Sequence, residues 1–248
     1  MNSLTLSKLV AAKNWRMGAL LIVFAGAALN APAAFSQTTP TATKTSAKPA
    51  KKAASATDPA ASATPVKTFG NKTAPITMEV FSDYQCPSCG SFFEQTLKPL
   101  LGPDGYVAAG KVYLVHRDFP LPMHAYSHQA ARWANAAAKI GKFQDIDAAL
   151  FDNQAGWSAD GNIEKYVAAA LSPTEFKRVQ KLMVGCEPTS TTCPLDAYIV
   201  SDQELGKSVP VQATPTFVIF YKGQKYPASS GIVTYPILKQ FFDSLLSQ

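Results

Sequence analysis

The stretch FSDYQCPSCGSFF (81–93) decides the fold of this chain, because it sets two cysteines two residues apart where a strand gives way to a helix. The run 75–83 just before the cysteines is nearly continuous in apolar and β-branched residues and predicts a buried strand. The run 88–101 has apolar residues at helical spacing. A cysteine pair at such a junction can bind zinc, close a structural disulfide or exchange electrons.

The position of Cys86 favours electron exchange. Its sulfur falls at the N-terminus of the predicted helix, where unpaired N–H groups and the helix dipole stabilise a thiolate. The pKa of such a thiol falls from about 8.5 to roughly 3.5–7.5. Pro87 has the fixed φ that suits a first helical position. Cys89 lies one turn further on, so we expect an exposed nucleophile at Cys86 and a sheltered partner at Cys89.

Zinc binding would need two more ligands at suitable spacing. Cys186 and Cys193 are seven positions apart, which is wider than the usual spacing of zinc-binding pairs. His124 and His128 have helical i,i+4 spacing but lack a third partner, so we expect them to be surface or packing residues. The sequence predicts no metal site and indicates no cofactor.

Cys186 and Cys193 flank the segment EPTSTT between two predicted helices. We expect a structural disulfide that stabilises the fold by about 2.5 kcal/mol in the chain-entropy model. A second redox pair is the alternative.

Two further features accompany the cysteines. Glu79 is a carboxylate within the first predicted strand; it is either a buried acid that exchanges protons with a thiol or a residue at a wet strand end. Pro215, in ATPTF (213–217), precedes another predicted strand, and an X-Pro bond there can be cis.

The charge of the chain is uneven. Residues 1–67 hold eight basic side chains and one acidic one, whereas residues 68–248 hold 15 basic and 16 acidic. The overall charge of +6 therefore belongs to the N-terminal part, and we expect no nucleic-acid partner. Residues 1–36 combine a basic start, a 13-residue apolar run and A-x-A sites, as in a signal peptide. An uncleaved membrane anchor is the alternative.

Residues 37–67 consist almost entirely of Ala, Thr, Ser, Pro and Lys and predict a disordered linker. The folded part, 68–248, reads strand, helix, strand, a helical block, then strand, strand, helix. A small α/β fold with an inserted helical subdomain is the simplest architecture with this order. The predicted strands are 75–83, 111–119, 214–221 and 224–228; the predicted helices are 88–101, 124–143, 145–154, 162–171, 172–184, 193–208 and 234–248. Ser172 and Glu175 form a capping box at the start of one of these helices.

Together, EVFSDYQCPSCGSFF, HRDFPLPMHAYSHQAARWANAA, LFDNQ and ATPTFVIF resemble the DsbA-like branch of the thioredoxin superfamily over essentially residues 70–248. The resemblance implies a thioredoxin-like fold with a core at 68–122 and 206–248 and a helical insertion at 123–205.

The resemblance also assigns roles to individual residues. It implies that Cys86 is the nucleophile, Cys89 the resolving cysteine and Pro215 the cis-proline that faces them. Thr214 would offer backbone groups to an extended substrate, and Glu79 would be the buried acid.

The chain departs from the family pattern at Ser88, which follows Pro87. The best-known DsbA enzymes have Cys-Pro-His-Cys, with histidine at this position. We therefore expect a potential between about −120 mV, as in DsbA, and about −270 mV, as in thioredoxin.

These features predict an exported thiol–disulfide oxidoreductase that introduces disulfides into unfolded or reduced exported proteins. The resemblance implies a membrane quinone-coupled re-oxidant of the DsbB or vitamin-K-epoxide-reductase (VKOR) type. We expect a periplasmic or secreted protein, membrane-tethered if the leader is uncleaved. The alternatives are a reductase or isomerase with the same active site kept reduced, and a non-catalytic thioredoxin-like binding domain.

Overall fold

A computed structural model describes residues 64–248, which form a mixed β-sheet covered by helices. The strand order is β1-β3-β2-β4-β5, with β6 also beside β4. The central strands β2 and β3 run parallel, and every other pairing is antiparallel. The strands are β1 (Thr68–Phe69), β2 (Ile76–Ser82), β3 (Val112–Asp118), β4 (Thr216–Tyr221), β5 (Gln224–Lys225) and β6 (Ser229–Ser230).

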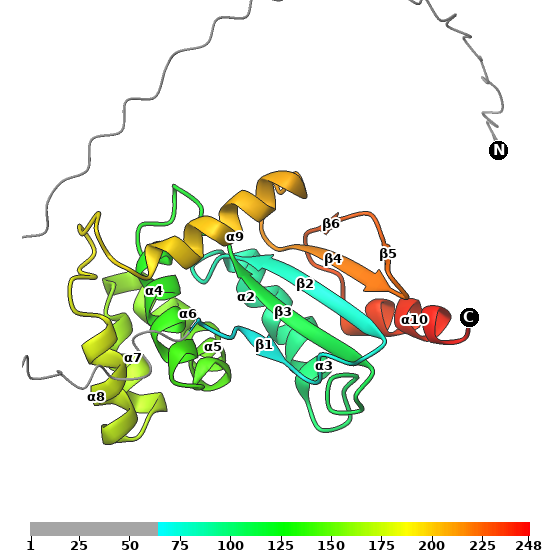
Figure 1. Cartoon of the computed structure of the whole chain (residues 1–248), viewed down its shortest axis with the longest axis horizontal. Coiled ribbons are helices and arrows are strands. Elements are labelled where there is room, and N and C mark those ends of the chain that lie inside the picture. Colours follow the sequence, from blue (N-terminus) through cyan, green and yellow to red (C-terminus); the bar gives the residue numbers. More distant parts are fainter. Residues whose placement is uncertain (1–63) are drawn as a thin grey trace, which may run out of the picture. The chain divides into compact units, whose positions relative to one another are not determined.

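Helices lie on both faces of this sheet. In Figure 1, α9 (orange) crosses one face, α2 and α3 lie partly behind the strands, and the helices α4 to α8 gather beside the sheet. The helices are α2 (Pro87–Phe92), the π-helical turn η1 (Phe93–Leu97), α3 (Lys98–Leu101), α4 (Ser127–Lys139), α5 (Phe143–Asp152), α6 (Gln154–Asp160), α7 (Ile163–Ala170), α8 (Pro173–Leu182), α9 (Asp196–Ser208) and α10 (Tyr235–Leu246).

The alternation of side chains along β2 gives the sheet two distinct faces. Ile76, Met78 and Val80 belong to the large core, which also contains the α2 cysteines and the apolar side of α10. Phe81 points the other way, into a small core with Val209 and partly buried residues of α9 and β4. We call these the α2 face and the α9 face.

The predicted α/β fold with an inserted helical block is confirmed, with local differences. The predicted helix 88–101 is one continuous helical stretch, but its middle turn is π-helical. The predicted helix 145–154 ends at Asp152, and α6 follows at once as a separate element that the sequence pattern did not predict. The capping box of α8 is confirmed, because the side chains of Ser172 and Glu175 bond each other's backbone N–H groups.

Lys67 belongs to the folded domain, although the sequence placed it in the linker. Its side chain is buried and forms ion pairs with Asp118 and, at 2.5 Å, Asp202. Its carbonyl also accepts a 2.9 Å hydrogen bond from the backbone N–H of His116. A lysine can be buried here because two carboxylates compensate its charge, and nothing in the local composition of 37–67 predicts such partners.

Most of α9 falls within the predicted insertion, yet it packs against β3 and covers the α9 face. It is therefore spatially part of the sheet layers. The helices that stand apart from the sheet are α4 to α8, which pack mainly on one another.

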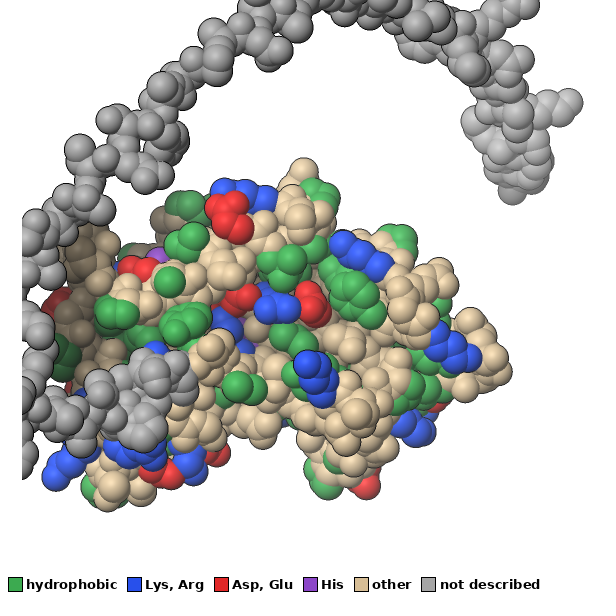
Figure 2. Space-filling view, viewed as in Figure 1, with side chains coloured by type: hydrophobic (Ala, Val, Ile, Leu, Met, Phe, Trp, Pro, Cys, Tyr) green, Lys and Arg blue, Asp and Glu red, His purple; other side chains and the backbone are tan. Residues whose placement is uncertain are grey.

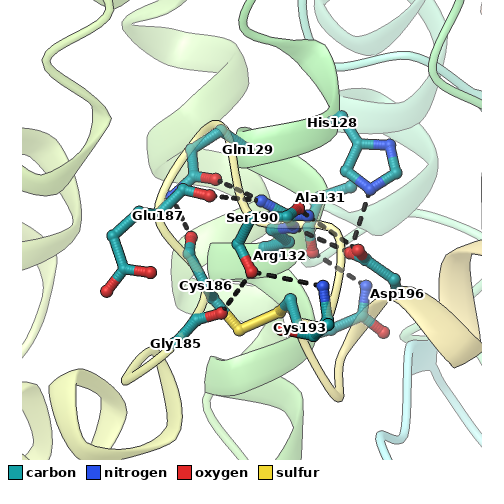
Figure 3. The surroundings of a disulfide bond; sticks show 12 residues. His128, Gln129, Ala131, Arg132, Gly185, Cys186, Glu187, Ser190, Cys193 and Asp196 are labelled. Carbon is teal, nitrogen blue, oxygen red and sulfur yellow. Dashed lines mark hydrogen bonds and ion pairs between the residues drawn. A yellow bond between two sulfur atoms is a disulfide. The ribbon is translucent and has the colours of Figure 1, made fainter.

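A disulfide between Cys186 and Cys193 closes the loop between α8 and α9. Figure 3 shows Arg132 of α4 reaching across to this loop. Its guanidinium donates 2.8 Å hydrogen bonds to the carbonyls of Glu187 and Ser190 and binds the Asp196 carboxylate at 2.7 Å. The loop is thus attached to α4 as well as closed by the disulfide.

Acidic and basic side chains are interspersed over the face of the molecule shown in Figure 2. Among the described residues, exposed ion pairs include Lys98 with Glu94 and Lys207 with Glu204. This face therefore offers a partner both signs of charge.

The predicted leader (1–36) and nearly all of the predicted linker (37–67) lie outside the described residues. Within residues 64–248, no helix has the length and apolar character needed to cross a membrane.

Candidate active site

Cys86 and Cys89 lie where β2 runs into α2. Cys86 is the N-cap residue of α2, with φ −68° and ψ 121°, and Pro87 is the first helical residue. The Cys86 carbonyl accepts backbone hydrogen bonds from Cys89 (3.0 Å) and Gly90 (3.1 Å), which close the first turn. Both cysteines are free thiols in this structure. Cys86 is 7% exposed and Cys89 1%, so Cys86 is buried rather than exposed as expected, although Cys89 is the more sheltered of the two.

The two thiols have opposite electrostatic environments. A hydrogen bond from Cys89 is the main reason that the pKa of Cys86 is lowered to about 5, although burial opposes it; Thr214 and the N–H groups of Cys89 and Ser88 add to the lowering. Burial raises the pKa of Cys89 well above its usual value, and the adjacent Cys86 raises it further. At neutral pH, Cys86 is therefore the thiolate and Cys89 keeps its proton.

The segment before β4 faces the first cysteine. The Thr214–Pro215 peptide bond is cis. The Cys86 Sγ lies 3.4 Å from the carbonyl oxygen of Thr214, to which a thiol can donate. The Thr214 hydroxyl is buried and has no well-aligned hydrogen-bond partner within residues 64–248. The structure thus brings the cysteine pair beside the Thr214–Pro215 segment, although 128 positions separate Cys86 from Thr214.

Glu79 does not join this group. Its neighbours in β2, Met78 and Val80, point into the core that contains the cysteines, so Glu79 points to the α9 face. There its carboxylate binds the Arg117 guanidinium at 2.8 Å, and its side chain is 17% exposed. The prediction that Glu79 exchanges protons with the thiols is corrected by this placement, because the sheet separates it from them.

Asp83 is the acidic residue that does contact the cysteine pair, and the sequence analysis missed it. Its backbone N–H donates to the Cys89 Sγ at 3.4 Å. Its buried carboxylate accepts hydrogen bonds from Ser127 (2.5 Å) and from the backbone N–H groups of Leu121 and Gln85 (both 2.8 Å), and it contacts His124 Nδ1 at 2.7 Å. The motif at 81–93 contains Asp83, but only the tertiary structure shows that its carboxylate binds residues of the segment 121–127.

The two histidines considered as metal ligands have carboxylate partners instead. His124 binds Asp83, and His128 Nε2 contacts Asp196 at 2.9 Å. In the part of the chain that the structure describes, no group of three or more His, Cys, Asp or Glu side chains is placed to hold a metal ion.

A second buried polar cluster lies behind the motif. The His116 ring stacks on Tyr84 and lies 3.3 Å from both Asp118 and Asp147. Burial would lower the pKa of His116, but the two carboxylates outweigh it and raise the pKa to about 9. Tyr84 also donates a 2.9 Å hydrogen bond to Asp147, so the residue two positions before Cys86 is fixed to α5.

Residues 62–232 match a family model described as "Thioredoxin". The chain belongs to the thioredoxin family.

Solved structures further identify the fold as DsbA-like. The alpha-DsbA1 structure from Wolbachia pipientis has 21% sequence identity and a TM-score of 0.58, covering 73% of this chain and 91% of that one. BdbD from Bacillus subtilis has 21% identity and a TM-score of 0.56, covering 75% and 97%. DsbA2 from Pseudomonas aeruginosa has 22% identity and a TM-score of 0.54, covering 73% and 94%.

One curated relative also matches. The Na(+)/H(+) antiporter NhaA 3 of Salinispora tropica is 35% identical over 86 residues, which are 34% of this chain. The match spans 12% of the antiporter's length.

Proposed function

We propose that this protein is an exported thiol–disulfide oxidoreductase that introduces disulfides into reduced exported proteins through Cys86 and Cys89. The observation that carries the proposal is the opposite environment of the two thiols: the Cys86 pKa is lowered to about 5, and that of Cys89 is raised. A stabilised thiolate favours the reduced form of the enzyme, so its disulfide oxidises other thiols readily.

The reaction follows from this asymmetry. In the oxidised enzyme, a substrate thiolate attacks the Sγ of Cys86, and the sulfur–sulfur bond to Cys89 breaks. Cys89 leaves with the electron pair and takes up a proton, as its raised pKa favours. A second substrate thiolate then attacks the substrate sulfur of the mixed disulfide, and Cys86 leaves as a thiolate. Two electrons pass from the substrate to the enzyme.

The substrate is an extended, reduced polypeptide. The Thr214 hydroxyl is buried beside Cys86 without a well-aligned partner within residues 64–248, and Pro87 and Ser88 are exposed next to the thiolate. These features suit a peptide chain that lies along the Thr214–Pro215 segment with its sulfur over Cys86.

Re-oxidation needs an electron acceptor, for which we propose a membrane quinone-coupled protein of the DsbB or VKOR type. The leader-like residues 1–36 support export to the periplasm or beyond. The buried Cys186–Cys193 disulfide also suits an oxidising compartment.

The deciding experiment is a glutathione titration of the Cys86–Cys89 couple, together with oxidative refolding of a reduced substrate protein. We expect a potential above about −230 mV, on the scale that separates oxidases from thioredoxin, and catalysed disulfide formation. A lower potential would favour the reductase or isomerase alternative. A pair that does not exchange with glutathione at all would favour a binding domain.

A further inference from the structure

We propose that Gln154 is a positioning residue for the reactive cysteine: its side-chain amide holds the backbone on both sides of residue 85 and thereby aims the first turn of α2 at the Cys86 sulfur. The inference rests on the proposed function and extends it to a residue of the helical block. Gln154 begins α6, the helix that the sequence pattern did not predict.

The contacts that carry this inference are two hydrogen bonds from one amide group. Gln154 Nε2 donates to the carbonyl of Tyr84 at 2.7 Å and to the carbonyl of Cys86 at 2.9 Å. Both partners can only accept, so the NH₂ end of the side chain must face them. One side chain therefore joins the backbone two residues before the N-cap of α2 to the N-cap residue itself.

Gly90 leaves the space that this arrangement needs. A Cβ atom at Gly90 would lie 2.4 Å from Gln154 Oε1 and 3.0 Å from its Cδ. Gly90 is buried and lies within α2, where glycine costs helix stability relative to alanine. The absence of a side chain there admits the Gln154 amide against the first turn of the helix.

The consequence for chemistry comes through the geometry of the turn. The Cys86 thiolate is stabilised in part by the N–H groups of Ser88 and Cys89, which must point at the sulfur. A fixed N-cap conformation keeps them aligned, and the amide also offsets the partial negative charge of the Cys86 carbonyl. Loss of the amide would weaken these donors without removing either cysteine.

The chain offers a matched control in the neighbouring amide. Asn153 is exposed, and its Nδ2 donates at 2.8 Å to the Ala149 carbonyl within α5, away from the cysteines. Asn153→Ala thus removes an amide from the same junction between α5 and α6. It leaves the contacts with the first turn of α2 in place.

The experiment compares Gln154→Ala, Gln154→Met and Asn153→Ala with the wild type. Thiolate absorbance at 240 nm against pH gives the Cys86 pKa, and a glutathione titration gives the equilibrium constant. We expect both Gln154 variants to raise the pKa by about 0.5 to 1 unit, the worth of one neutral hydrogen bond. The constant should shift about three- to tenfold toward the enzyme disulfide, which lowers the potential by about 15 to 30 mV.

Gln154→Met keeps the length and packing of the side chain, so it separates the lost donor from a packing defect. Gly90→Ala should raise the Cys86 pKa in the wild type by displacing the amide, and should add little in the Gln154→Ala background. Equal effects of Gly90→Ala in both backgrounds would overturn the inference, as would Gln154 variants that titrate like Asn153→Ala.

The wild type is measured first. If its cysteine pair does not exchange with glutathione, the proposed function itself fails. If the wild type exchanges normally but the Gln154 variants keep its pKa and potential, only the positioning role fails.

Discussion

Removing the Cys186–Cys193 disulfide should destabilise the protein and leave its chemistry intact. The bond joins residues seven positions apart, so it closes a loop of eight residues. In the chain-entropy model, such a loop contributes about 2.5 kcal/mol to the free energy of unfolding. For a domain of this size, that corresponds to a melting temperature about 5 to 10 °C lower. Arg132 also holds this loop by two carbonyls, so the native loop should keep its place without the disulfide.

The assay uses the double variant Cys186→Ala/Cys193→Ala beside the wild type, both with the Cys86–Cys89 pair oxidised. Urea unfolding gives the free-energy difference, and oxidative refolding of a reduced protein gives the turnover. A loss of stability below about 0.5 kcal/mol would refute the loop-closure reasoning. Lost turnover in a variant that remains folded would show that the pair takes part in electron transfer.

Three further predictions concern the two active-site cysteines and the buried Lys67. The Cys86 thiolate should titrate near pH 5. Because this pKa is lowered, its contribution to the stability of the reduced protein is complete above the unfolded thiol's pKa and is lost as the pH falls through about 5. Urea unfolding of the reduced and oxidised forms should therefore show a difference that shrinks between about pH 9 and pH 5. Cys89→Ser should accumulate a mixed disulfide with glutathione at Cys86, seen by mass spectrometry; rapid release would contradict the resolving role. Lys67→Met should cost about 3 to 5 kcal/mol in urea unfolding, because Asp118 and Asp202 lose their buried partner; a loss below 1 kcal/mol would contradict it.

The local features of the site could be predicted from the sequence because neighbouring residues produce them. The apolar run 75–83 and the helical spacing of 88–101 predicted the strand and helix that place Cys86 at a helix N-terminus. The capping box of α8 was predictable for the same reason, since Ser172 and Glu175 are three residues apart. The family motifs extended this to the fold as a whole.

The face on which Glu79 lies was decided by the tertiary structure. The apolar residues of β2 alternate with Thr77 and Glu79, so Glu79 lies on the opposite side of the strand from them. Only the packing of α2 and α9 decides which of the two sides faces the cysteines. The same holds for Lys67, whose burial depends on carboxylates from β3 and α9.

What the sequence by itself determined is the candidate reactive pair, its position at the start of a helix and the class of fold. What only the tertiary structure decided is which side chains support that pair. Cys86 contacts Gln154, 68 positions further along the chain, and Thr214, 128 positions further along. Such contacts depend on how the helical block and the β4 strand pack against the sheet, and local periodicity does not encode that packing.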